Sequence, residues 1–468
     1  MPLAAGCLGS GGGGGGGVPA ATERLPAGAR VAPASARAFI SFNTESGTPR
    51  SRRQAELYRR LAGLEVGLFK TLASGGTREV GSELDLVFLP GGGDVVWLAR
   101  PRKKGGLEAL LKQRVLRARR VTTADAGGWT ILADSRNLLD RFLREARVGK
   151  LADDQAFRDS MGRVDAHDAA RVYLKGGSAQ VTLDQELSRR GAPPLLSEEV
   201  GTLVAIAFGA RAEAAGIRLD AIVRISGDVR ANAYTAQLPQ ETPAGAILYV
   251  SFNHLDLVLK KVLKVVAEQN STFEQQLSQV TAVMDITLNH DVYPLLSHEG
   301  AIAVYQGRPL PKVALVLRLK DVARAKRVLG RLVTIAELAA GASTRRFGFG
   351  GVRLVEVDLS HRRTRVFAAV FRDELAVTND KQLLEKLIEG KGAKLSEAAA
   401  FRDLLRASKM PQRTLGFVYG KPGEVQSAVG AVLGHVPVPV TSESGPRAIA
   451  YVTREGDRYA LTGFVTIK

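Results

Sequence analysis

Two stretches of the chain alternate between apolar and polar residues with a period of two, which is typical of β-strands with one solvated face. They lie at 200–227 and 446–467. In the second stretch, Tyr459, Leu461 and Gly463 form one series, and the residues between them form the other. Each stretch is long enough for two strands, so the pattern predicts a long antiparallel pair in each place.

Other segments have helical spacing or the short apolar runs of strands. Paired helices are expected at 135–147 and 153–161, and again at 380–389 and 396–406. Further helices are expected at 50–73, 254–284 and 321–339, and further strands at 38–42, 94–100, 129–134, 246–252, 301–306, 312–318, 352–358, 365–371 and 374–378. The predicted fold class is α+β, mainly antiparallel sheet with helices packed on one side.

Short sequences recur in the same order along the chain. Ser41-Phe42-Asn43 returns as Ser251-Phe252-Asn253, an offset of 210 residues. Phe157-Arg158-Asp159 returns as Phe401-Arg402-Asp403, and Val172-Tyr173 returns as Val418-Tyr419, at offsets of 244 and 246. The shared order predicts two tandem homologous halves, 37–238 and 239–468, in which the repeated phenylalanines are core residues.

The first 36 residues differ from the rest in composition. Gly9–Gly17 is glycine except for Ser10, and Gly/Ser-rich chain buries little and is flexible. The only cysteine follows small residues, as Ala4-Ala5-Gly6-Cys7, which resembles the end of a bacterial lipoprotein signal peptide. Residues 1–36 are therefore predicted to be a disordered tether, lipidated at Cys7, with a span of roughly 25–30 Å.

The lipoprotein hypothesis has an open alternative. Only six residues precede Cys7, whereas a signal peptide has a basic start and an apolar stretch of about 7–15 residues. The hypothesis therefore requires a start codon further upstream. Otherwise the segment is a short N-terminus with an incidental cysteine.

The two helix pairs carry a pattern that resembles a family of exported bacterial proteins with a large duplicated domain of unknown function. The matching residues are Asn379, Leu383, Leu384, Leu395, Ser396, Phe401 and Leu405 in the second half, and Asp134, Leu138, Leu139, Leu151, Ala152 and Phe157 in the first. The resemblance covers about 38–467. It implies an exported, membrane-anchored protein and no particular activity.

The net charge of the chain indicates which class of partner to expect. With 65 Lys and Arg against 47 Asp and Glu, the net charge is +18, which favours anionic partners. Two basic segments, 100–120 and 318–331, are expected to follow a strand and enter a helix. The residues expected to contact anionic lipid or an anionic wall polymer are Arg100, Arg102, Lys103, Lys104, Arg117, Arg119, Arg120, Arg324, Lys326 and Arg327. Neither segment contains an aromatic residue, which argues against single-stranded nucleic acid.

The chain shows no recognisable constellation for catalysis. His290 and His298 lack a third metal ligand at a recognised spacing, and no phosphate-binding loop or nucleophile elbow is present. We predict no catalytic residue, no metal and no cofactor. The sequence favours a non-enzymatic cell-envelope lipoprotein at the outer face of the cytoplasmic membrane. The alternative is a soluble, cytoplasmic nucleic-acid-binding protein.

Overall fold

The computed structural model describes most of the chain outside its N-terminus. The described ranges are 25–44, 81–91, 94–100, 122–189, 202–227, 232–269, 286–308, 310–340, 342–359, 364–425 and 445–466, with four single positions between 270 and 285. The predicted helix 50–73 lies outside them. No helix within these ranges is long and apolar enough to cross a membrane.

The described strands form one antiparallel sheet of eighteen members. From one end, the order is β4 (Thr122–Ala126), β5 (Trp129–Ala133), β3 (Val95–Ala99), β2 (Glu83–Phe88), β1 (Ala38–Asn43), β6 (Ala170–Lys175), β7 (Thr202–Ala212) and β8 (Gly216–Ser226). It continues through β18 (Arg458–Thr466), β17 (Ala448–Glu455), β16 (Gly416–Gly420), β9 (Leu248–Phe252), β10 (Gly300–Tyr305), β11 (Lys312–Arg318), β15 (Glu374–Thr378), β14 (Thr364–Phe371), β13 (Val352–Leu359) and β12 (Ser343–Phe349). The α+β prediction is confirmed.

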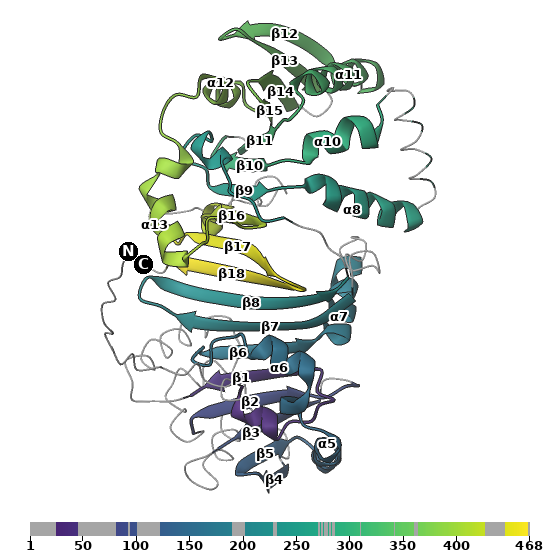
Figure 1. Ribbon diagram of the computed structural model, residues 1–468, viewed down its shortest axis with the longest axis vertical. Coiled ribbons are helices and arrows are strands. Elements are labelled where there is room, and N and C mark those ends of the chain that lie inside the picture. Colours follow the sequence, from purple (N-terminus) through teal and green to yellow (C-terminus); the bar gives the residue numbers. More distant parts are fainter. Residues whose placement is uncertain are drawn as a thin grey trace, which may run out of the picture.

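The longest strands lie at the centre of this sheet. β7 and β8 are the hairpin expected at 200–227, and β17 and β18 are the pair expected at 446–467. β8 pairs with β18 from Arg224–Arg458 at one end to Gly216–Thr466 at the other. The sheet therefore continues without a break across the middle of the molecule (Figure 1).

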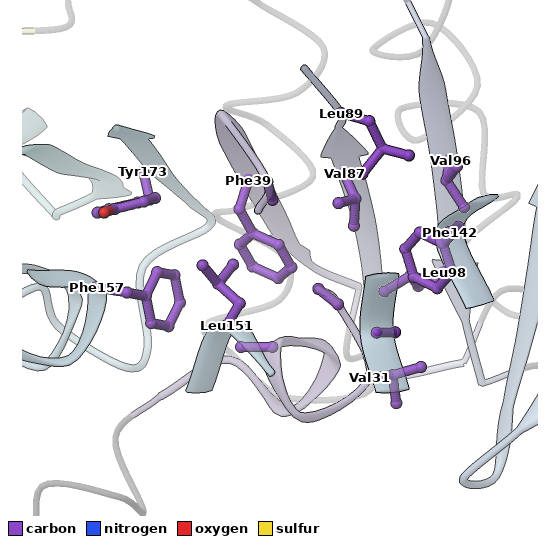
Figure 2. Close-up of a cluster of buried hydrophobic side chains, with 14 of the residues drawn as sticks. Val31, Phe39, Val87, Leu89, Val96, Leu98, Phe142, Leu151, Phe157 and Tyr173 are labelled. Atoms are coloured by element: carbon purple, nitrogen blue, oxygen red, sulfur yellow. The ribbon is translucent and has the colours of Figure 1, made fainter. Parts of the chain in front are cut away.

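One face of the sheet carries the predicted helix pairs. In the first half these are α5 (Arg136–Val148) and α6 (Gln155–Met161), capped by Ser135 and Asp154, whose side chains accept from the amides of Leu138 and Phe157. Phe157 is fully buried, with its ring 5.8 Å from Phe39 and 4.9 Å from Tyr173 (Figure 2). Because Phe157 joins the helix layer to the sheet, it is a central residue of this core.

A second pair of helices packs on the same face of the sheet in the C-terminal part of the chain. These helices are α12 (Lys381–Glu389) and α13 (Ala399–Ser408), and the Asp380 carboxylate caps α12 at the amide of Leu383. Phe401 packs edge-on against Tyr419, with 5.1 Å between ring centroids. The interpretation of both phenylalanines as core residues is confirmed.

Phe157→Ala is expected to destabilise the fold by about 3–5 kcal/mol, because removal of a buried ring loses its contacts and leaves a cavity. Urea unfolding followed by circular dichroism would measure the loss. Val148→Ala is the control, because Val148 is 92% exposed. A change below about 1 kcal/mol for Phe157→Ala would contradict the proposed packing.

The prediction that helices pack on one side only is wrong. In α11 (Val322–Ala340), Ala325 and Val328 pack against Val370 of β14. The next residue along that strand, Phe371, belongs to the core beneath α12. Because neighbouring strand residues point to opposite faces, α11 covers the face opposite α12. Figure 1 shows α11 with α8 (Leu255–Gln269) and α10 (Tyr293–Leu296) on the other side of the strands from α12 and α13.

Residues 25–36, which the sequence analysis assigns to the tether, pack into the first half. The 3-10 turn η2 (Ala27–Arg30) leads into Ala32, which is fully buried and whose carbonyl accepts from the amide of Leu151. Pro33 bridges to Lys150. The small side chains of alanine allow this close approach, although the composition of the segment resembles that of a linker. The sequence pattern also missed β2, β4 and β12.

Candidate functional site

Most of the predicted contact residues lie outside the described ranges. These are Cys7, Arg102, Lys103, Lys104, Arg117, Arg119 and Arg120. Arg100 follows β3 and is exposed, with its guanidinium 4.7 Å from the centre of the Trp129 ring. That contact is a cation–π interaction at the end of the sheet that carries β4.

The second basic segment follows β11 and enters α11, as the sequence predicts. Arg324 lies in the first turn, where its amide donates to the Asp321 carboxylate and its guanidinium is 3.5 Å from it. Lys326 and Arg327 are exposed. The strand order separates this helix from Arg100, so α11 and Arg100 lie toward opposite ends of the sheet (Figure 1).

The central strands carry a charged cluster on the face that bears α6 and α13. Arg211 of β7 lies 3.1 Å from Asp168, 3.0 Å from Asp220 and 3.2 Å from Glu213. Asp168 is nearly fully buried, and burial raises its pKa to about 6 against the opposing effect of Arg211. One arginine thus neutralises carboxylates from three segments of the first half.

Several contacts of this cluster join the first half to the second. Arg218 of β8 donates to the carbonyl of Ala407 at 3.1 Å, and Arg224 pairs with Asp457 at 3.3 Å. Thr462 of β18 donates to Asp220 at 2.8 Å. The cluster therefore ties α13 and the β17–β18 turn to β8, in addition to the backbone pairing of β8 with β18.

The charged cluster continues into the core of the first half. Across β2, β1 and β6, Asp85, Ser41 and Arg171 are neighbours in register. Asp85 is fully buried, and burial with the nearby Glu83 raises its pKa well above the ordinary value. Burial also lowers the pKa of Arg171, although the nearby carboxylates oppose that shift. Burial therefore favours the neutral form of Asp85.

A second acid pair lies in the second half, beside the 3-10 turn η5 (Leu238–Gln240). Glu374 of β15 is almost completely buried, and burial, with a hydrogen bond to Glu241, raises its pKa to about 8. The hydrogen bond from Glu374 lowers the pKa of Glu241, which also pairs with Arg318 at 2.5 Å and Arg372 at 3.2 Å. The two carboxyls therefore share one proton between two arginines.

These groups do not have the geometry of a catalytic centre. In the described ranges, no three His, Cys, Asp or Glu side chains are arranged to hold a metal ion. His298 is hydrogen-bonded to its neighbour Ser297, and His167 contacts Asp165 two residues away. The central charged side chains pair with one another across strands and turns, so their observable effect is to hold the sheet together.

The opposite face of the central strands is apolar. Phe208, Leu219, Leu461 and Val418 all lie on it, as the pairing register of β7, β8, β18, β17 and β16 requires. Leu219 is 43% exposed, and Leu461 and Val418 are each 41% exposed. Soluble proteins seldom leave such contiguous apolar area in water, and where they do it commonly marks a binding surface.

Sequence reasoning missed this surface although part of the signal was visible. Both series of the alternating pattern at 446–467 contain apolar residues. Within the described part of the chain, α13 packs on the series of Phe464, which is fully buried. The side chains of the other series, which includes Leu461, are partly exposed to solvent. Strand periodicity separates the two faces but does not say which of them a helix covers.

Comparisons with known proteins add a family and no activity. A model of the family DUF3352, described as a protein of unknown function, matches residues 113–427. No curated protein matches the chain. Crystal forms IV and I of TP0453 match with TM-scores of 0.26 and 0.25 and identities of 12% and 8%. These matches cover 49% and 45% of this chain and 93% and 88% of the TP0453 chain, and no inference follows from them at such scores.

Proposed function

Because the chain belongs to the DUF3352 family of proteins of unknown function, we propose its role from its surfaces: it is a non-enzymatic binding protein of the cell envelope. The observation that carries the proposal is the contrast between the two faces of the central strands. The charges on one face pair internally, whereas the other face is apolar and half-exposed. A surface of that kind is suited to binding and offers no group for catalysis.

The proposal includes a duplicated body. The strand order β4-β5-β3-β2-β1-β6-β7-β8 corresponds, member by member, to β14-β15-β11-β10-β9-β16-β17-β18. β12 and β13 are then an addition to the second copy. Antiparallel pairing of β8 with β18 relates the copies by an approximate two-fold axis.

Matching contacts at matching places also support the duplication. Pro33 bridges to Lys150 in the first half, and Pro243 bridges to Lys394 in the second. The amide of Gly28 donates to Glu83 at 3.2 Å, and that of Leu238 donates to Glu299 at 2.8 Å. In both halves, a carboxylate at the start of a strand thus holds the opening turn: Glu83 is the first residue of β2, and Glu299 directly precedes β10.

We further propose that Cys7 anchors this body in the outer leaflet of the cytoplasmic membrane. The support is the sequence Ala4-Ala5-Gly6-Cys7 together with the glycine-rich segment after it. Because Leu25 already packs against the core, the link from Cys7 to the body is shorter than the sequence analysis expects. A Gly/Ser-rich link of that length has an r.m.s. span of roughly 20–25 Å. The body would therefore remain close to the lipid surface.

Cys7→Ser is expected to move the protein from the membrane fraction to the soluble fraction when the gene is expressed from its own upstream region. A diacylated cysteine holds a protein stably at a membrane, whereas the serine cannot form the thioether. Fractionation and incorporation of labelled fatty acid would measure the change. Ser10→Ala is the control. Unchanged membrane association of Cys7→Ser, with no label in the native protein, would overturn the anchor.

Basic residues of α11 supply a second, weaker contact in this proposal. Basic side chains near an anionic membrane contribute about 1 kcal/mol each. Reversing Lys326 and Arg327 to Glu is therefore expected to weaken binding to anionic vesicles by roughly tenfold or more at low salt. Co-sedimentation of the Cys7→Ser protein would measure it. Equal binding by the reversed variant would remove α11 from the contact surface.

A further inference from the structure

We propose that the apolar face of the central strands binds the acyl chains of membrane lipids. The proposal rests on the proposed function, because the anchor is what brings this face next to lipid. The face, named here the central apolar face, is formed by alternate residues of five adjacent strands, β7, β8, β18, β17 and β16.

The side chains on the central apolar face favour acyl chains as the ligand, because nearly all of them are uncharged. The pairing register places mainly aliphatic residues and glycines on the central apolar face, among them Phe208, Leu219, Leu461, Val452 and Val418. The charged residue among the five strands on this side is Arg454, beside the turn at Gly456, whose carbonyl it contacts at 2.7 Å. A surface without charge complements a ligand without charge.

The backbone pairing of these five strands also favours acyl chains. Each of the five strands is paired along both edges in its central part, so the amides and carbonyls there are used within the sheet. The face therefore presents side chains alone, which is what hydrocarbon requires of a protein surface. A protein partner would be expected to find a polar rim with about one hydrogen bond per 100–200 Å². Within these strands the face offers mainly the hydroxyl of Tyr459 and the guanidinium of Arg454 for such bonds.

The arrangement of large and small side chains on the central apolar face also favours acyl chains. Leu219, Gly463, Ala450 and Val418 follow one another directly across β8, β18, β17 and β16. The two outer members are the exposed leucine and valine, and the two inner members are small. A strip of small residues between larger apolar ones lets a linear chain make contact along its length.

A single-cysteine labelling experiment tests the proposal on the full chain. Because Cys7 is the only cysteine, Cys7→Ser combined with Leu219→Cys places one environment-sensitive dye on the central apolar face. We expect a blue shift of its emission on addition of phosphatidylcholine vesicles, which carry no net charge and so do not attract the basic segments. Val148→Cys in the same background is the matched control. That valine is 92% exposed on α5, and no shift is expected there.

Substitution of residues on the central apolar face gives an independent measure of lipid binding. In the Cys7→Ser background, Leu219→Glu and Leu461→Glu are each expected to reduce flotation with phosphatidylcholine vesicles at least tenfold, because a carboxylate must enter hydrocarbon. Val148→Glu should leave flotation unchanged. Circular dichroism would verify that each variant is folded, and Leu461→Gln replaces Leu461→Glu if that variant is not.

Three outcomes would overturn the proposal. Absence of both the dye shift and flotation would show that the face does not bind lipid. A dimer in light scattering that Leu219→Glu converts to monomer would mean that a second copy covers the face. Equal flotation of Leu219→Glu, Leu461→Glu and their control would place lipid binding elsewhere. None of these depends on lipidation of Cys7, so a failure here is distinct from a failure of the anchor.

Discussion

Gly28→Leu is expected to destabilise the protein by about 3 kcal/mol or more. A Cβ atom at Gly28 would lie 1.7 Å from Oδ2 of Asp85 and 2.8 Å from its Cγ, and Asp85 is fully buried. The carboxyl cannot swing into solvent, so the turn or the strand must shift, and overpacking of this kind typically costs 1–3 kcal/mol or more. Denaturant unfolding would measure the loss. Arg30→Leu, at an exposed position of the same turn, is the control.

At the positions that correspond to Gly28 and Asp85, the second half has a large residue next to a small one. In the proposed duplication, Leu238 corresponds to Gly28 and Ala301 corresponds to Asp85, since Ala301 pairs with Ser251 as Asp85 pairs with Ser41. Gly28→Leu combined with Asp85→Ala should therefore recover stability to within about 1 kcal/mol of the native protein. A double variant as unstable as Gly28→Leu alone would contradict both the clash and the equivalence of the two sites.

Glu374→Gln is expected to remove a pH dependence of stability. The folded state raises the pKa of Glu374 to about 8, above its ordinary value of 4.5, chiefly by burial. The folded state therefore binds the proton more tightly than the unfolded state does. The stability that this provides is fully present below pH 4.5 and is lost as pH rises through 8. The opposite shift of Glu241 offsets part of it, so the change is smaller than the roughly 5 kcal/mol that the shift of Glu374 alone would give.

Urea unfolding at several pH values would measure this effect. The native protein should lose stability between pH 5 and 9, whereas Glu374→Gln, which still donates to Glu241, should show a flatter profile and exceed the native protein at pH 9. Glu389→Gln, an exposed residue on α12, is the control. Parallel profiles for the native protein and Glu374→Gln would show that the two carboxyls do not share a proton.

The sequence predicted those elements whose pattern is local. The helix pairs around Phe157 and Phe401 were predicted from helical spacing and from their recurrence, and β11 coincides with the predicted strand at 312–318. Residues 25–36 were misassigned because alanine, proline and glycine occur both in linkers and in tightly packed turns. Their burial depends on the strand and helix that they touch, which local composition does not reveal.

The candidate surfaces depended on long-range pairing and were largely missed. Arg211 and Asp168 are far apart in sequence, and nothing local indicates that they meet. The exposure of Leu219 cannot be deduced from strand periodicity, since the equivalent side of β14 is covered by Ala325 and Val328. The basic segment at 318–331 was visible from composition alone, but its separation from Arg100 along the sheet required the strand order.

The pairing of β8 with β18 has an evolutionary consequence. Asp220 lies opposite Thr462 in the register. In the proposed duplication, the matching of Tyr173 with Tyr419 makes Asp220 and Thr462 each other's counterpart in the two copies. The axis that relates the copies therefore passes through this pair. A single ancestral copy would present β8 as an open edge, able to join the same strand of an identical chain across a two-fold axis. The present molecule has the topology that results when the subunits of such a homodimer become fused in one gene.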